Sequence, residues 1–183
     1  MKQKEGICNI MNNQEKQTFA KKSLTNALLK LLKDKPLQEI TISELSRESQ
    51  ISRVSFYRNY PNMEAILEEH ISHLLHKWNE ENHLAFETDL KDNGRNDLQL
   101  ASLFGHIKEH EDFYKLLFER ELLQLMIPQL KIVLIPSEKS DNFAAYLESF
   151  SLYGIYGWIQ EWIKRGMTES AEELEVWLRM REI

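Results

Sequence analysis

Cysteine, glycine and proline are scarce in this chain of 183 residues. Its single cysteine, Cys8, excludes an intrachain disulfide and fits a reducing compartment, so we expect a cytoplasmic protein. There are only 6 Gly and 4 Pro, and no stretch alternates apolar and polar residues over the length of a strand. Apolar residues recur instead every three to four positions, which predicts an all-α fold.

Long apolar runs and catalytic motifs are missing as well. The longest uncharged run, residues 149–160, is shorter than the roughly 18 to 20 apolar residues that a membrane-spanning helix needs. Residues 1–10 lack the apolar segment of a secretory signal. There is no glycine-rich phosphate loop, no cysteine–histidine pair in register and no serine in a nucleophile elbow. We therefore expect no membrane contact, no enzyme activity and no cofactor.

The net charge of -6 is unevenly distributed. Residues 14–61 hold nine lysine or arginine residues against five acidic residues, whereas residues 62–183 hold twelve against twenty-three. A mildly basic front end on an acidic chain indicates a polyanionic partner for that end.

Helical periodicity and capping residues divide the chain into nine expected helices. We treat residues 1–13 as a disordered leader, and residues 88–97 as the most loop-like stretch. Pro36 stops the first helix. The helices are expected at about 14–33, 42–48, 53–60, 62–84, 97–110, 112–119, 121–134 with a kink at Pro128, 141–165 and 170–181.

The second and third helices have complete start signals. Thr41 and Glu44 form a capping box, and Ile40 and Leu45 occupy the positions of a hydrophobic staple. Ser52 caps the next helix after a tight turn. Two short helices joined in this way behind a longer helix have the layout of a helix-turn-helix unit.

The third helix carries a compact arginine and tyrosine cluster. At about 100° per residue, Phe56 and Tyr60 face inward together. The outward surface consists of Arg53, Val54, Ser55, Tyr57 and Arg58. Guanidinium groups fit the acceptor pair on guanine, and an apolar side chain suits the thymine methyl group. The alternative is an ordinary solvent-exposed helix whose Tyr57 and Arg58 pack locally.

The stretch "ITISELSRESQISRVSFYRNYPNMEAIL", residues 40–67, resembles the helix-turn-helix of TetR-type transcriptional regulators. The usual run of that family is close to "T-x-x-x-I-A-x-x-A-G-V-S-x-G-T-L-Y-R-Y-F-x-S-K-E-x-L". The matching positions are Thr41, Leu45, Ile51, Ser52, Ser55, Phe56, Tyr57, Arg58, Tyr60, Asn62, Glu64 and Ile66. The closing stretch "YGIYGWIQEWIKRGMTESAEEL", residues 153–174, resembles the last two helices of many Gram-positive members.

The resemblance implies a homodimer that binds a double-stranded DNA operator and a small-molecule effector. Residues 14–61 would form the helix-turn-helix DNA-binding domain, and residues 62–183 a C-terminal regulatory and dimerisation domain. Carried over by position, the residues at base edges are Arg53, Val54, Ser55 and Arg58, and those at phosphates are Thr41, Ser43, Tyr57 and Asn59.

Three positions depart from the usual residues of the family. Gln50 replaces the turn glycine, Val54 replaces a second glycine, and Met63 replaces a lysine that touches phosphate. Loss of that lysine should weaken DNA binding and lower its salt dependence by about one phosphate contact.

The C-terminal half supplies an aromatic and Met-rich interior and a helix, 141–165, that is apolar nearly all round. At helical spacing such residues are core first and pocket lining second. The expected pocket residues are Phe104, Phe113, Phe118, Met126, Tyr146 and Phe150. The residues expected at a dimer interface are Phe150, Gly154, Gly157, Trp158 and Trp162. The alternative is that these residues are buried inside one chain.

All six histidines lie between residues 70 and 110. His106 and His110 would share a helix face and could bind a metal with His70, His73 or His76. The alternative, which we prefer from the sequence, is a set of surface histidines beside acidic residues, so we expect no metal.

These patterns lead us to expect a ligand-responsive, dimeric DNA-binding transcriptional repressor that recognises a palindromic operator through helix 53–60. One alternative is a TetR-fold interaction protein with weakened DNA contact, whose C-terminal domain binds a protein partner. Another is a helical enzyme or metal protein, which stoichiometric zinc would support.

Overall fold

The computed structural model describes residues 12–93, 97–135 and 141–180. These residues hold nine α-helices and no strand, which confirms the all-α fold. The chain divides into two compact units, residues 1–70 and 71–183. The division falls inside one long helix, whereas the sequence placed it at the start of that helix.

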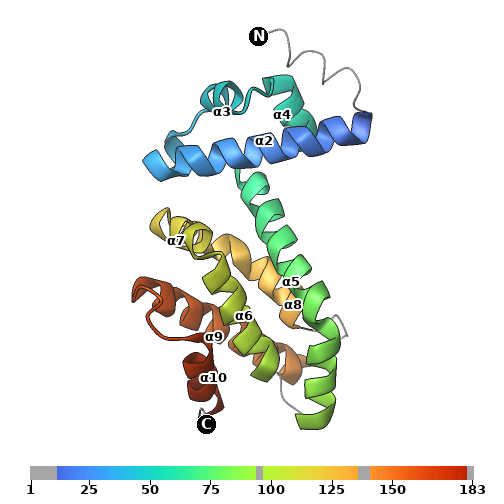
Figure 1. The fold of residues 1–183 in the computed structure, drawn as a ribbon, viewed down its shortest axis with the longest axis vertical. Helices are drawn as coiled ribbons and strands as arrows, with labels where there is room; N and C mark the ends of the chain where they lie inside the picture. The colour runs from blue at the N-terminus through green and yellow to red at the C-terminus, as the bar shows by residue number, and fades with distance from the viewer. Residues whose placement is uncertain (1–11, 94–96, 136–140, 181–183) are drawn as a thin grey trace. The chain divides into compact units, whose positions relative to one another are not determined.

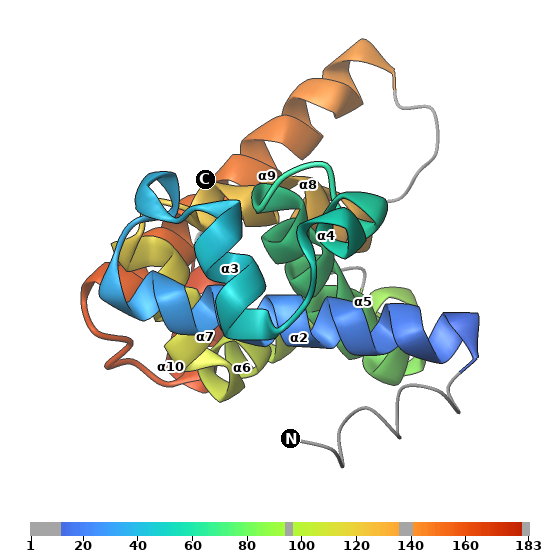
Figure 2. The same cartoon turned by 90° about the horizontal axis from the view of Figure 1, so that it is seen from above.

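The first unit is built on α2 (Asn13–Asp34), against which α3 (Ile42–Ser49) and α4 (Arg53–Asn59) both pack. A 3-10 turn, η1 (Leu37–Glu39), connects α2 to α3. Both views show α3 and α4 on the same side of α2 (Figure 1 and Figure 2). The fully buried side chains at their junction are Leu24, Leu28, Leu32, Leu45 and Phe56.

The helix α2 begins earlier than the sequence predicted. Asn12 Oδ1 accepts the Glu15 N–H at 2.9 Å, and the Glu15 carboxylate accepts the Asn12 N–H at 2.7 Å. This capping box places Asn12 and Asn13, which we had assigned to a disordered leader, at the start of the helix. The rest of that segment, residues 1–11, lies outside the described residues.

The long helix α5 (Glu64–Asn93) runs from the first unit into the second. Asn62 Oδ1 accepts the Ala65 N–H at 2.9 Å, as the sequence predicted for a cap. The helix continues well past residue 84 into the stretch predicted as a loop. Phe86 is 8% exposed, and its ring centroid lies 5.4 Å from that of Trp78. Burial of these two rings favours the helical extension.

The second unit contains the rest of α5 together with α6 (Asp97–Glu109), α7 (Glu111–Glu119), α8 (Ile127–Leu134), α9 (Asn142–Lys164) and α10 (Ala171–Arg179). The helix α6 packs against α7 and α10, while α9 packs against α7 and α8. Fully buried residues include Leu75, Leu103, Phe104, Ile107, Tyr114, Leu117, Met126, Leu130 and Ile159. Within the described ranges, no helix is both long enough and apolar enough to cross a membrane.

Pro128 lies at the start of a helix and does not kink one. A 3-10 turn, η2 (Leu123–Met126), precedes α8, and Pro128 lies in the first turn of α8, where its missing N–H costs no hydrogen bond. The single helix expected at 121–134 is therefore wrong. The expected signals after α9 are confirmed: Gly166 has φ +85°, and the Ser170 hydroxyl accepts the Glu173 N–H at 3.2 Å.

Candidate nucleic-acid interface

The helix α3 begins at the predicted capping box. Thr41 Oγ1 accepts the Glu44 N–H at 3.2 Å, and the Glu44 carboxylate accepts the N–H and the hydroxyl of Thr41, each at 2.9 Å. The hydrogen bond from Lys35, followed by those from Thr41, lowers the pKa of Glu44 to about 2. A carboxylate therefore lies beside the predicted phosphate contact, and the N–H groups of Ile42 and Ser43 remain for an external anion.

The turn between α3 and α4 depends on one left-handed residue. Gln50 ends α3 with φ 59° and ψ 23°, a conformation that glycine adopts more easily. Ser52 then caps α4, because its hydroxyl oxygen accepts the Ser55 N–H at 3.1 Å. The chain thus makes the turn of a helix-turn-helix without the usual glycine.

The inner face of α4 is held by aromatic packing, as the helical spacing predicted. Phe56 is fully buried, Tyr60 is 4% exposed, and their ring centroids lie 6.5 Å apart. Lys21 Nζ lies 5.4 Å from the centroid of the Tyr60 ring and 2.7 Å from a carboxylate oxygen of Glu69. These contacts join α4 to α2 and to the first turns of α5, and they fix which face of α4 points outward.

The outer face of α4 is exposed and basic. Val54 is 62% exposed and Tyr57 is 55% exposed, and the side chains of Arg53 and Arg58 are exposed beside them. Among the described residues, neither guanidinium group has an ion-pair or hydrogen-bond partner. Both positive charges are therefore available to an external acceptor, although the chain as a whole is acidic.

Two of the remaining residues predicted to contact DNA are bonded to each other within the first unit. Ser55 is half-buried, and the Asn59 side-chain amide donates to the Ser55 carbonyl at 2.7 Å. Thr41 and Ser43 are exposed at the start of α3. The structure thus brings the eight predicted residues together on two successive helices and their caps. Met63 is half-buried just before α5.

The size of α4 suits the major groove of DNA. Its seven residues span about 10 Å at 1.5 Å per residue, and the major groove is about 12 Å wide. A helix of this length places its side chains over a few base pairs, with the flanking helix ends near the phosphates.

The second unit contains two cavities of a size that suits small ligands. One, of about 610 Å³, is lined by α5, α6 and α10 and includes Trp78, His106 and Glu175. The other, of about 300 Å³, lies between α9 and α10 and includes Trp158, Trp162 and Trp177.

None of the six expected pocket residues lines either cavity. Phe104 and Met126 are fully buried in the core, whereas Phe113 and Phe118 are half-buried on α7. Tyr146 and Phe150 are 78% and 73% exposed on α9. The structure therefore does not bring these six residues together around a described cavity.

One face of α9 is exposed and apolar. The side chains concerned are at least half exposed and recur at helical spacing: Phe143, Tyr146, Leu147, Phe150 and Tyr153. Of the expected interface residues, Phe150 and Gly157 are exposed and Gly154 and Trp158 are half-buried on this helix. Trp162 differs, because it is 3% exposed and packs edge-on against Phe104, so it belongs to the core of its own unit.

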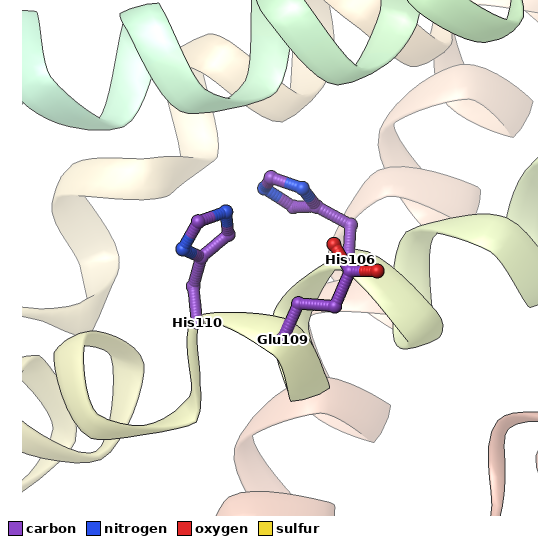
Figure 3. Close-up of side chains that lie close together, drawn as sticks. All are labelled: His106, Glu109 and His110. Atoms are coloured by element: carbon purple, nitrogen blue, oxygen red, sulfur yellow. The ribbon is translucent and has the colours of Figure 1, made fainter.

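Two of the histidines lie together at the end of α6. The ring centroids of His106 and His110 are 4.8 Å apart, and Glu109 lies beside them (Figure 3). His106 is 7% exposed and forms a hydrogen bond of 3.3 Å between Nε2 and the Tyr114 hydroxyl. Burial, with a smaller contribution from His110, lowers the pKa of His106 to about 4, so its ring is neutral at pH 7.

Sequence reasoning missed two residues that support the site. Lys35 holds the carboxylate that caps α3, and Lys21 holds Tyr60 and Glu69. Both lysines reach their partners through the folded unit, so no local spacing in the sequence marks them.

A short exposed basic helix, held by a capped helix and a tight turn against a third helix, defines a helix-turn-helix DNA-binding protein. Residues 24–70 match the profile described as bacterial regulatory proteins, tetR family, and residues 96–178 match the profile described as transcriptional regulator C-terminal region. The chain belongs to the TetR family of transcriptional regulators.

A solved structure has the same fold. It is the crystal structure of a TetR transcriptional regulator from Streptococcus agalactiae 2603V, with 20% sequence identity and a TM-score of 0.64. The match covers 93% of this chain and 97% of that chain. Comparison with curated proteins gives no match.

Proposed function

We propose that this protein is a dimeric, ligand-responsive repressor that recognises a palindromic operator through α4. The guanidinium groups of Arg53 and Arg58 carry the proposal. Both are exposed and have no partner in the part of the chain that the structure describes, and each can donate two hydrogen bonds to the O6 and N7 atoms of a guanine. Val54 between them offers an apolar contact for a thymine methyl group. Thr41 and Tyr57 lie at the margins of this surface, where phosphates would pass.

The partner that we propose for the apolar face of α9 is a second copy of the chain. Five large apolar side chains on one exposed helix face are unusual for a monomer, and they favour a self-complementary interface. Trp177 on α10 is 48% exposed and lines a neighbouring cavity with Gly157 and Trp158 of α9. The neighbouring cavity of about 300 Å³ can receive a side chain of the second copy. The resemblance to the family supports the same arrangement.

Dimerisation explains how a single short helix achieves operator specificity. Two copies of α4, about 34 Å apart, would contact two half-sites one helical turn apart on the same side of the duplex. An effector that binds one arrangement of the dimer better than another shifts the separation of the two helices and releases DNA. The residues that would line the effector pocket stay a prediction.

The proposal is tested by gel shift with the DNA upstream of the protein's own gene, across a salt series. We expect a discrete complex that survives competition by unrelated DNA. Arg53→Ala and Arg58→Ala should each relax base preference, at a cost of about 1–3 kcal/mol of discrimination. Lys131→Ala on α8 is the matched control, because it removes one exposed positive charge from the second unit. Tight, specific binding that ignores both arginine variants would contradict the assignment of α4.

A protein partner in place of DNA is the alternative outcome of this experiment. Binding that depends steeply on salt and ignores sequence would show only phosphate contact. Such a result, together with a protein that co-purifies with the chain, would favour an interaction protein built on the TetR fold.

A further inference from the structure

Three side chains that can bind a metal lie together at the end of α6, two in its last turn and one in the residue that follows it. His106, Glu109 and His110 follow the spacing i, i+3 and i+4, which brings side chains together on a helix. One ligand atom from each residue lies within 4.8 Å of the others (Figure 3). His106 and Glu109 belong to the last turn of α6, and His110 follows it as the residue between α6 and α7. The His110 N–H donates to the His106 carbonyl at 3.3 Å, which holds this residue at the end of the helix.

This arrangement is close to the geometry that a transition metal requires. Bonds of about 2.0–2.1 Å from zinc to nitrogen or oxygen imply ligand atoms about 3.3 Å apart in a tetrahedral site. Glu109 is exposed and His110 is half-buried, so both can turn about their side-chain bonds to close the remaining gap. His106 is buried and supplies the fixed point of the site.

The surroundings of His106 suit a metal ligand. A ligating imidazole usually has a partner on its other ring nitrogen, which fixes its orientation and tautomer. The Tyr114 hydroxyl lies 3.3 Å from His106 Nε2, and when Nε2 donates to it the Nδ1 lone pair is free. Trp78 packs on the same ring at a centroid distance of 5.9 Å.

The charge around the site also favours a cation. The three residues line the cavity of about 610 Å³, whose other charged residues are Lys77, Glu81, Glu172 and Glu175. Lys77 lies 3.8 Å from Glu81, which offsets its charge. The site lies in the last turn of α6, where the helix dipole is negative. His73 of α5 lines the same cavity and is available, with water, for a fourth position.

We propose that His106, Glu109 and His110 bind a late first-row transition-metal dication, for which Zn²⁺ is the probe. Two imidazoles and one carboxylate suit Zn²⁺, Co²⁺, Ni²⁺ or Cu²⁺ in preference to Mg²⁺ or Ca²⁺, which take oxygen ligands. The site is separate from α4, and binding of the metal does not depend on the proposed repressor function.

The test is Zn²⁺ titration of the full chain after removal of metals with a chelator, in competition with a chromophoric zinc indicator. All proteins carry Cys8→Ser, so that the single thiol does not contribute. We expect one Zn²⁺ per chain. His110→Ala and Glu109→Gln should each weaken binding at least about tenfold, since even partners of ligands contribute that much.

His83→Ala is the matched control, because His83 is an exposed histidine of α5 that does not line the cavity. It should bind Zn²⁺ like the parent protein. Far-UV circular dichroism checks that each variant is folded, and Glu109→Gln is informative even if a histidine variant is unstable. Co²⁺ in place of Zn²⁺ should give visible absorption bands that His110→Ala weakens. Less than one Zn²⁺ per chain, or equal affinity in all four proteins, would overturn the proposal.

Discussion

Lys35 Nζ lies 2.8 Å from Glu44 Oε1 and joins the loop after α2 to the first turn of α3. The same ammonium group donates to the Glu39 carbonyl at 2.9 Å. Exposed ion pairs usually contribute little to the free energy of unfolding. This pair has a further effect, because it holds the carboxylate that caps the helix preceding α4.

The contribution of Glu44 to stability should depend on pH. Its pKa is lowered from 4.5 to about 2 in the folded protein, first by Lys35 and then by Thr41. As the pH falls, the unfolded chain therefore binds this proton before the folded chain does. The stabilisation by ionised Glu44 is fully present above about pH 4.5 and is lost as the pH falls towards 2. Urea denaturation should show that the difference in free energy of unfolding between the parent protein and Glu44→Gln becomes smaller over this pH range.

Lys35→Met supplies the control for this prediction. In the Lys35→Met protein, Glu44→Gln should lower the free energy of unfolding by less at neutral pH, because the largest cause of the lowered pKa of Glu44 has been removed. If the difference in free energy of unfolding between the parent protein and Glu44→Gln stays constant from neutral to acid pH, the role given to this ion pair is contradicted.

Gln50→Gly should stabilise the protein. A non-glycine residue in the left-handed region costs about 1–2 kcal/mol, and Gln50 has φ 59°. Glycine removes that strain but adds roughly 0.5–1 kcal/mol of backbone entropy to the unfolded chain. We expect the free energy of unfolding to rise by about 0.5–1 kcal/mol, measured by urea denaturation.

The matched control is Arg47→Gly, in the interior of α3, which should lower the free energy of unfolding by about 1 kcal/mol. If both glycine variants lose stability to the same extent, the turn at Gln50 is not strained.

Local chemistry explains which parts of the fold the sequence predicted. The caps at Thr41, Ser52, Asn62 and Ser170 each depend on a partner three residues away, so they can be found without knowledge of the tertiary structure. The inward position of Phe56 follows in the same way from helical spacing.

Long-range packing explains what the sequence did not reveal. Residues 88–93 belong to the stretch with loop-like composition, yet they continue α5. Phe86 just before them is 8% exposed, and this burial depends on how α5 packs in the folded chain. Tyr146 and Phe150 are aromatic residues of the kind that line pockets, but both are exposed because of the way in which α9 is oriented. For His106 and His110 the spacing predicted a shared face, whereas the burial of His106 depends on how α6 packs.

Met63→Lys should strengthen DNA binding and increase its dependence on salt. Met63 lies just before α5, where related regulators usually have a lysine at phosphate, and it is half-buried with no charge. One added phosphate contact per protomer gives two per dimer, which should steepen the slope of log affinity against log salt by about 1.8. Fluorescence anisotropy with labelled operator DNA across a salt series measures this slope.

Met63→Gln is the control for that prediction, because it adds a polar group of similar length without charge. Its slope should equal that of the parent protein. An unchanged slope in Met63→Lys would mean that residue 63 does not approach a phosphate when the protein binds DNA.

Phe150→Glu should convert the proposed dimer into monomers. Phe150 is 73% exposed in the single chain, near the middle of the apolar face of α9, and burial of such a side chain contributes about 1.5–3 kcal/mol. In a two-fold symmetric interface the substitution acts twice and places two carboxylates close together. Light scattering coupled to size-exclusion chromatography should report half the mass of the parent protein.

Leu84→Glu on α5, where Leu84 is 69% exposed, is the matched control and should leave the mass unchanged. A Phe150→Glu protein that remains dimeric would place the interface on another surface, and the apolar face of α9 would then need a different partner.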